Sequence, residues 1–218
     1  AEFSKILENV FRSINIGLVN EIKMISDKMN IDIFDIIKIA SSKPFGFMPF
    51  FPGPGVGGHC IPLDPFYLKW KAESLGTSTK FIQLAHKINI QIKEWIISKI
   101  DKCIGGLNKK KILILGAAYK KNIDDCRESP SLDIISDLIK KKSKVQYHDP
   151  FVKKLPITRK HKMNMKSIKI NKTNIKKFDA IVILTDHDNV NYNLIKKNSK
   201  MIFDSRGVYK VNKKIIRI

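Results

Sequence analysis

The sequence lacks the features that would place it in several specialised classes of protein. It holds only three cysteines among 218 residues and no Cys-x-x-Cys pair, which argues against a disulfide framework and against a zinc site. No apolar run approaches the roughly 20 residues that a membrane-spanning helix needs. The N-terminus has no basic stretch followed by an apolar one, as a secretory leader would have. We therefore expect a cytoplasmic protein that binds no metal and does not associate with a membrane.

Arginine is also scarce, since it supplies only five of the 41 basic residues. The formal net charge of +21 suggests a nucleic-acid-binding protein, but residues 1–76 carry eight basic and eight acidic residues, so the whole excess lies in the rest of the chain. There the lysines stand at the ends of apolar runs, not among exposed aromatics or in an arginine-rich recognition helix. Specific nucleic-acid binding is therefore the less favoured alternative.

The first hundred residues predict a helical domain. Over residues 2–29 apolar side chains recur at steps of three and four, which predicts one long helix. Further helices are expected over 32–41, with Asp32 as the cap, over about 65–73 and over 79–104. The long apolar stripe suggests burial against a second copy of the chain. Because the chain opens as though inside a helix, we expect it to be part of a longer protein or of a split gene.

From Lys109 onward the pattern changes to strands that alternate with helices. Strands are predicted in KKILILGAAY, KVQYHDP, FDAIVILTD and KMIFDSRGVY, and helices in SPSLDIISDLIKKK and near 192–197. The lysine-rich stretch from 153 to 172 gives no clear signal. This alternation is typical of a doubly wound parallel sheet. The predicted fold class is therefore α/β, with a helical domain over 1–106 and a Rossmann-like sheet domain over 107–218.

Between the helices over 32–41 and 65–73 lies a loop rich in proline and glycine. Its letters GPGVGG, from Gly53 to Gly58, match the dinucleotide fingerprint G-x-G-x-x-G, which requires a strand before it and a helix directly after it. The preceding FMPFFP cannot form a central strand, and we expect Pro62 and Pro65 to block an immediate helix. The alternative is a glycine loop that leads into a cysteine, with bare backbone N–H groups at Gly57 and Gly58 beside Cys60.

Three long segments carry a resemblance to a known family. The stretch PFGFMPFFPGPGVGGHCIPLDPFYLKWKA resembles the catalytic-cysteine segment of the UDP-glucose/GDP-mannose dehydrogenase family. AEFSKILENVFRSINIGLVNE resembles the long central helix of that family, and ILGAAYKKNIDDCRESPSLDII the opening of its UDP-binding domain. The three occur in the family's order, and the similarity extends over essentially the whole chain. KPFGFMPF looks most like the branch that oxidises UDP-N-acetylglucosamine or a related UDP-N-acetylhexosamine.

The resemblance implies a four-electron, NAD-dependent oxidation of the sugar C6 alcohol to a carboxylate. Cys60 would be the nucleophile, forming a thiohemiacetal and then a thioester. Lys5 and Asn9 match positions on the central helix that hold the oxyanion or a water over the thiol, and their spacing of four puts them on one helical face. Asp64 matches a carboxylate that helps to activate the hydrolytic water. For Lys5, Asn9 and Asp64 the alternatives are a solvent-facing or a turn residue.

In the second domain the resemblance assigns Tyr119 and Lys120 to the UDP moiety. Arg206 matches an arginine near the substrate, and Arg127 matches one that reaches toward the cofactor. A solvated lysine pair at 120–121 is the alternative for Lys120. The family also has an N-terminal NAD-binding domain, to which no segment of this sequence corresponds. We therefore expect the chain by itself to be inactive, with NAD bound by a separate chain, or to be a non-catalytic remnant that binds a UDP-sugar and dimerises.

Overall fold

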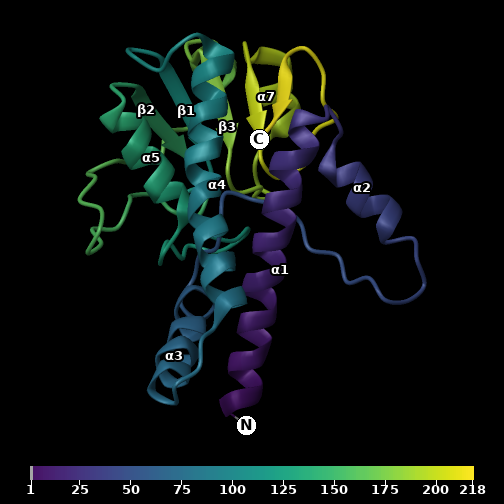
Figure 1. The fold of residues 1–218 in the computed structure, drawn as a ribbon. Helices are drawn as coiled ribbons and strands as arrows, with labels where there is room; N and C mark the ends of the chain where they lie inside the picture. The colour runs from purple at the N-terminus through teal and green to yellow at the C-terminus, as the bar shows by residue number, and fades with distance from the viewer. Residues whose placement is uncertain (1) are drawn as a thin grey trace.

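The structure is a computed structural model that describes residues 2–218. Its first part, residues 2–104, is helical (Figure 1) and contains α1 (Glu2–Lys28), α2 (Ile33–Ala40), α3 (Cys60–Ser74) and α4 (Lys80–Ile104). The long helices α1 and α4 run beside each other, and α3 packs against the N-terminal half of α1. Gly17 of α1 allows this close approach, because a Cβ there would lie 3.2 Å from the Cα of Ala85. The predicted long helices are confirmed.

The second part, residues 111–218, is an α/β sheet structure. It contains β1 (Lys111–Leu115), α5 (Pro130–Lys140), β2 (Lys144–His148), α6 (Lys172–Ile175), β3 (Ala180–Ile183), α7 (Tyr192–Asn198), β4 (Ile202–Asp204) and β5 (Ile215–Arg217). All neighbouring strands are parallel, in the order β2-β1-β3-β4-β5. The predicted fold class, a helical region followed by a parallel α/β sheet, is confirmed.

Helices cover both faces of this sheet because alternate strand residues point to opposite sides. On one face Ile112 and Ile114 of β1 pack with residues of α5 and with the C-terminal half of α4. On the other face Leu113 and Leu115 pack with Ile175 of α6 and residues of α7. Helix α4 therefore belongs to the core of the sheet as well as to the helical part. The division at 106/107 stays a prediction, although α4 ends at Ile104 and β1 starts at Lys111.

Three local expectations need correction. The prolines at 62 and 65 do not prevent an immediate helix, because α3 begins at Cys60. Pro62 lies in the first turn, where a backbone N–H has no intrahelical partner, so its missing donor costs nothing. The four-residue α6 and the three-residue β5 were missed, since such short elements among lysines leave no readable periodicity.

Of the helices within 2–218, none is both long and apolar enough to cross a bilayer.

One charged side chain lies in the core near the C-terminal end of α1. Lys23 is 1% exposed, its Nζ has no hydrogen-bond partner among the described residues, and it lies 5.4 Å from the centre of the Trp95 ring. Burial, together with the positive charges of Lys99 and Arg217, lowers the pKa of Lys23 to about 7. A buried amine of this kind destabilises the folded state whenever it is protonated.

The pKa of Lys23 predicts how stability depends on pH. Between pH 7 and its ordinary pKa of 10.5, the unfolded chain holds a proton on Lys23 that the folded protein has lost. The free energy of unfolding should therefore rise with pH by about 1.4 kcal/mol per unit across this window. Lys23→Met should remove that slope and stabilise the protein most at pH 7 and below. Urea unfolding at several pH values, with the exposed Lys28→Met as the matched control, measures the difference; equal slopes in both variants would contradict it.

Candidate functional site

The glycine loop is held against the helices by buried asparagines. The backbone N–H of Gly53 donates to Oδ1 of Asn20 at 3.1 Å, and Nδ2 of Asn20 donates to Oδ1 of Asn89 at 3.1 Å. Nδ2 of Asn89 in turn donates to the carbonyl of Ser13 at 3.1 Å. Asn20 is fully buried and Asn89 nearly so. Because these hydrogen bonds link α1, α4 and the loop, they fix where the loop leaves the helical part.

The glycines of this loop are sites of close approach for the sheet part. A Cβ on Gly57 would lie 2.5 Å from the Cβ of Tyr119, and one on Gly58 would lie 3.0 Å from the ring of the same tyrosine. A Cβ on Gly53 would lie 2.6 Å from a guanidinium nitrogen of Arg206. Gly58 also has a φ of +88°, which disfavours any side chain, and its N–H donates to the carbonyl of Arg127 at 2.9 Å. The loop is glycine-rich because the sheet part packs onto it.

Cys60 is the first residue of α3 and is exposed at the end of this loop. The residue before it, His59, makes no capping hydrogen bond with its side chain, so the free N–H groups of the first turn have no side-chain cap. The positive end of the helix dipole and these N–H groups favour a negative charge on an oxygen beside the sulfur. The other two cysteines differ: burial raises the pKa of Cys126 to about 12, and burial also raises the pKa of Cys103.

Asn9 and Asp64, which the sequence placed 55 residues apart, meet in the structure. Nδ2 of Asn9 on α1 donates to Oδ2 of Asp64 on α3 at 2.6 Å, and Asn9 is 1% exposed. Since Cys60 and Asp64 are four residues apart on α3, they share a helical face. Lys5 is not part of this contact: it is exposed, and its amine pairs with Glu8 at 3.1 Å. The structure therefore groups Cys60, Asp64 and Asn9, and leaves Lys5 in solvent.

The sheet residues predicted for the ligand lie on the loops after β1 and β4. Tyr119 is half-buried against the glycine loop, and Lys120 beside it is exposed. Nε of Arg206 donates to Asp186 at 3.1 Å. Arg127 is exposed and binds both carboxylate oxygens of Asp125, which lowers the pKa of that carboxyl. These four residues stay candidates for ligand binding, since their positions are compatible with it.

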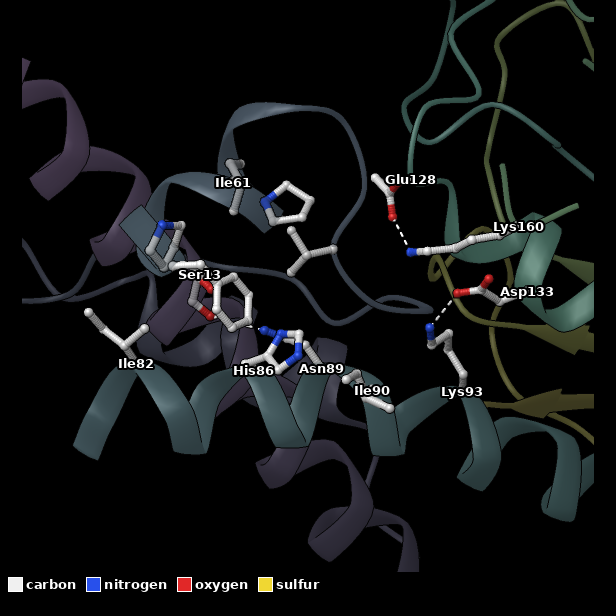
Figure 2. Close-up of a pocket in the computed structure, with 14 residues that line it drawn as sticks. Ser13, Ile61, Ile82, His86, Asn89, Ile90, Lys93, Glu128, Asp133 and Lys160 are labelled. Carbon is white, nitrogen blue, oxygen red and sulfur yellow. Dashed lines mark hydrogen bonds and ion pairs between the residues drawn. The ribbon is translucent and has the colours of Figure 1, made fainter. Parts of the chain in front are cut away.

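We call the contact between the glycine loop and the loop after β1 the seam. A cavity of about 150 Å³ lies next to it, between the helical and sheet parts (Figure 2). Ile61 of α3, His86 and Asn89 of α4, and the ion pair of Lys160 with Glu128 line it. Burial and the charges of Lys93 and Lys160 lower the pKa of His86, which is therefore neutral at pH 7. Cys60 and Asp64 do not line this cavity, so it belongs to the contact between the two parts.

The described residues do not fit a dinucleotide cofactor. No strand precedes the glycine loop, and Tyr119, Pro130 and Arg206 occupy the space beside its glycines. The first loop of the sheet is also closed, because a Cβ on Gly116 would lie 2.3 Å from Thr185. NAD therefore has no fitted site on either glycine segment. Within residues 2–218, no group of three His, Cys, Asp or Glu side chains is placed to hold a metal ion.

Several residues of the site gave no recognisable signal in the sequence. Asn20 and Asn89 lie on amphipathic helices that carry other polar residues, and only their burial at the α1–α4 contact shows what they do. Asp125 and Asp186 look like ordinary loop acids, yet each binds one of the candidate arginines. The available signal was weak: an asparagine on the apolar face of a predicted helix suggests a buried polar contact but does not name its partner.

The loop, the thiol helix and the parallel sheet together correspond to one family. The family models described as the UDP-glucose/GDP-mannose dehydrogenase family, central domain, and UDP-glucose/GDP-mannose dehydrogenase family, UDP binding domain, match residues 1–91 and 113–211 respectively. The chain belongs to the UDP-glucose/GDP-mannose dehydrogenase family. This confirms the resemblance drawn from the three sequence segments.

Individual relatives act on UDP-N-acetyl sugars by name. UDP-N-acetyl-D-mannosamine dehydrogenase of Methanococcus maripaludis is 34% identical over 226 residues, which cover 97% of this chain and 49% of the relative. UDP-N-acetyl-D-glucosamine 6-dehydrogenase of Salmonella typhi is 33% identical, over 86% of this chain and 44% of its own length. The solved UDP-D-ManNAc dehydrogenase from Pyrococcus horikoshii has a TM-score of 0.84 at 29% identity, covering all of this chain and 51% of that one. The chain thus spans about half the length of these relatives.

The asparagine contacts make a testable prediction for the glycine loop. Asn20→Ala leaves the Gly53 N–H and Oδ1 of Asn89 without a buried partner, so the free energy of unfolding should fall by about 2–3 kcal/mol. Hydrogen exchange at Gly53 should accelerate as well. Asn15→Ala is the control, because the amide of Asn15 bonds only the carbonyl of Phe11 one turn earlier in the same helix. An effect no larger than the control's, on both measurements, is the result that contradicts this role.

Proposed function

We propose that this chain provides the nucleophilic thiol and the UDP-binding surface of an enzyme that oxidises C6 of a UDP-N-acetylhexosamine to the uronate. The observation that carries the proposal is the position of Cys60, exposed at the start of α3 where the glycine loop meets the loop after β1. The names of the relatives, which specify UDP-N-acetyl sugars, support the substrate class. Within that class we favour UDP-N-acetylglucosamine, on the strength of the KPFGFMPF segment.

The residues around Cys60 suit two covalent steps. In the first, the sulfur forms a bond to the C6 aldehyde carbon, the carbonyl electron pair moves to the oxygen, and a proton converts that oxyanion to the hydroxyl of a thiohemiacetal. The free N–H groups of the α3 first turn can bind the oxyanion. In the last step, water attacks a C6 thioester, the C–S bond breaks, and the carboxylate and the free thiol result. Asp64, held by Asn9, is placed on the Cys60 face of α3 to orient that water.

The hydride acceptor is NAD, as in the family, and we assign it to no described residue. Neither glycine segment fits a dinucleotide, so we propose no NAD site on either of them. Arg127 is a candidate to reach toward it, from its exposed position on the loop before α5. We therefore assign no described side chain to the hydride-transfer steps. Lys5 can join the thiol site only if its amine leaves Glu8.

We also propose that the chain forms a homodimer through α1. This helix and the residue after it leave a row of large apolar side chains exposed, comprising Phe3, Leu7, Phe11, Leu18, Ile22 and Ile25 of α1 and Met29 just beyond its end. The row lies on the side of α1 that α4 does not cover, and the groove beside it, lined by Val19, Ile33, Ile37 and Phe50, is apolar too. Exposed apolar surface of this extent is typical of an interface between subunits.

The dimer proposal predicts that a charge in the row produces a monomer. Leu18→Glu should lower the mass measured by light scattering from that of two chains to that of one, because a carboxylate buried at the interface loses its hydration. Ile139→Glu on α5, an equally apolar and exposed position outside the row, should leave the mass unchanged. A wild-type chain that is monomeric at high concentration would refute the proposal.

The proposed thiol chemistry has its own test. The purified chain should bind UDP and UDP-N-acetylglucosamine in calorimetry, and should release no NADH with UDP-N-acetylglucosamine and NAD unless NAD-binding residues are supplied with it. With a complete enzyme that carries these residues, Cys60→Ala should abolish NADH formation, a loss of at least about 10³-fold. Cys103→Ala, an exposed cysteine on α4, should have full activity. Binding of UDP with no NADH formation in that enzyme would identify a remnant that keeps only the UDP site, and activity that survives Cys60→Ala would contradict the role of the thiol.

A further inference from the structure

The loop that carries Tyr119 and Lys120 is held from both sides by residues of neighbouring strands. It follows β1, which lies between β2 and β3 in the sheet. Because these strands are parallel, the segments that follow them emerge at the same edge. Asp149 directly follows β2, and His187 lies four residues after the end of β3. Both side chains are fully buried and flank residues 116–122, which we call the β1 loop.

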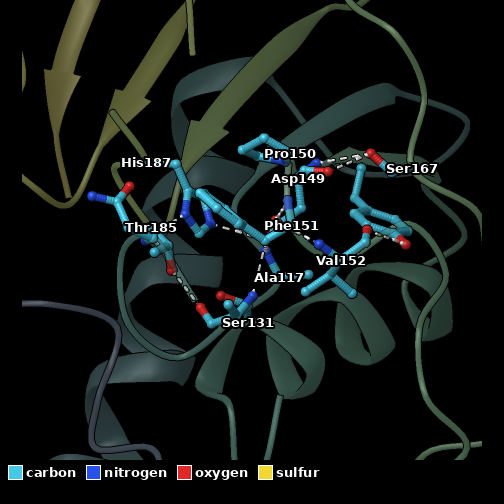
Figure 3. Close-up of polar contacts among 12 residues, drawn as sticks. Ala117, Ser131, Asp149, Pro150, Phe151, Val152, Ser167, Thr185 and His187 are labelled. Carbon is cyan, nitrogen blue, oxygen red and sulfur yellow. Dashed lines mark hydrogen bonds and ion pairs between the residues drawn. The ribbon is translucent and has the colours of Figure 1, made fainter. Parts of the chain in front are cut away.

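Asp149 accepts five hydrogen bonds (Figure 3). Its Oδ2 accepts from the backbone N–H groups of Ala117 at 2.7 Å and Ala118 at 3.1 Å, and from Nε2 of His187 at 3.0 Å. Its Oδ1 accepts from the N–H groups of Phe151 at 2.8 Å and Val152 at 2.9 Å. Burial raises the pKa of this carboxyl, but the hydrogen bonds outweigh it and hold the pKa well below its usual range. Asp149 is therefore ionised and can only accept.

This makes the tautomer of His187 determinate. Since Asp149 only accepts, Nε2 of His187 carries the hydrogen. Its Nδ1 accepts from the backbone N–H of Asn122 at 2.9 Å, so Nδ1 carries none, and the ring is neutral. The imidazole is thus a bridge from the carboxylate under the start of the β1 loop to the backbone at its end. Its ring also packs against Phe151, with the centres 5.2 Å apart.

The carbonyls at the start of the loop are held as well. Oγ1 of Thr185 donates to the carbonyl of Ala118 at 2.6 Å, and Oγ of Ser129 donates to the carbonyl of Ala117 at 2.7 Å. The backbone N–H and C=O of both alanines are thereby engaged. Tyr119 and Lys120 lie between these fixed alanines and Asn122, which is fixed by His187. Neither Asp149 nor His187 is exposed, so neither can touch a ligand of the site.

We propose that Asp149 and His187 are positioning residues of the UDP site. They hold the β1 loop in the shape that presents Tyr119 to the glycine loop and Lys120 to a bound diphosphate. This inference rests on the proposed UDP binding. When the loop can leave that shape, the apparent dissociation constant for UDP rises by the inverse of the fraction of molecules that keep it.

The test uses His187→Leu, which removes both hydrogen bonds of the ring, and His187→Asn, whose amide oxygen can still accept from Asn122. We expect His187→Leu to raise the dissociation constant for UDP, measured by calorimetry, about tenfold, since a loop in the competent shape one-tenth of the time has that effect. His187→Asn should recover part of the affinity. Hydrogen exchange should accelerate at the amides of 117–122 in His187→Leu while the amides of β1 and β3 stay protected.

Two comparisons separate positioning from general destabilisation. Ile195→Ala removes a fully buried side chain of α7 that belongs to a different hydrophobic cluster from Ala117 and Ala118, and it should bind UDP like the wild type at temperatures where it is folded. Unchanged UDP affinity in His187→Leu, with a wild type that binds, overturns the positioning role and leaves the proposed function standing. A wild type that fails to bind UDP overturns the proposed function; exchange at 117–122 then still decides whether His187 holds the loop.

Discussion

The position of helix α4 in two packing environments determines where every part of the site lies. Near its start, Ala85 touches Gly17 and Asn89 bonds the backbone of α1, so α4 is fixed to the helical part. Further along, Ile92, Ile96 and Ile100 are fully buried in the core of the sheet. A helix is stiff and rises about 1.5 Å per residue, so these two attachments fix the distance and the orientation between the helical part and the sheet part. The glycine loop and the β1 loop meet because α4 places them opposite each other.

The glycines at the seam follow from that geometry. Once α4 has brought the two loops together, the backbone at Gly53, Gly57 and Gly58 lies against Arg206 and Tyr119 with no room for a Cβ. A loop that binds phosphate and a loop that makes room for a neighbouring side chain can therefore share the pattern G-x-G-x-x-G for different physical reasons. What separates them is the element before the loop: a dinucleotide site needs a strand there, and this chain has an extended segment with prolines.

Much of the fold could be predicted from the sequence because its long elements have strong periodicity. The apolar stripe of α1 repeats over many turns, and β1 and β3 are continuous apolar runs, so each could be recognised. The start of α3 was mispredicted because Pro62 stands in the first turn, where its missing donor costs nothing, and because α3 tolerates Pro65 in its interior. The pairing of Asp149 with His187 depends on the strand order β2-β1-β3, which no local pattern encodes. The burial of Lys23 could not be predicted either, since a lysine on a helix is ordinarily solvated.

The effect of the chain's positive charge on ligand binding depends on which acidic residues are already paired inside the protein. At the edge of the sheet where the parallel strands end, Asp149 binds backbone N–H groups and His187, Asp186 binds Arg206, and Asp204 binds Arg217. These carboxylates are already engaged by donors inside the protein, so they repel an incoming anion much less than free ones would. The exposed Lys120 therefore contributes its positive charge at that edge with less opposition from these carboxylates. An excess of lysine concentrated after residue 76 therefore favours a diphosphate ligand at the seam, and it requires no nucleic acid to account for it.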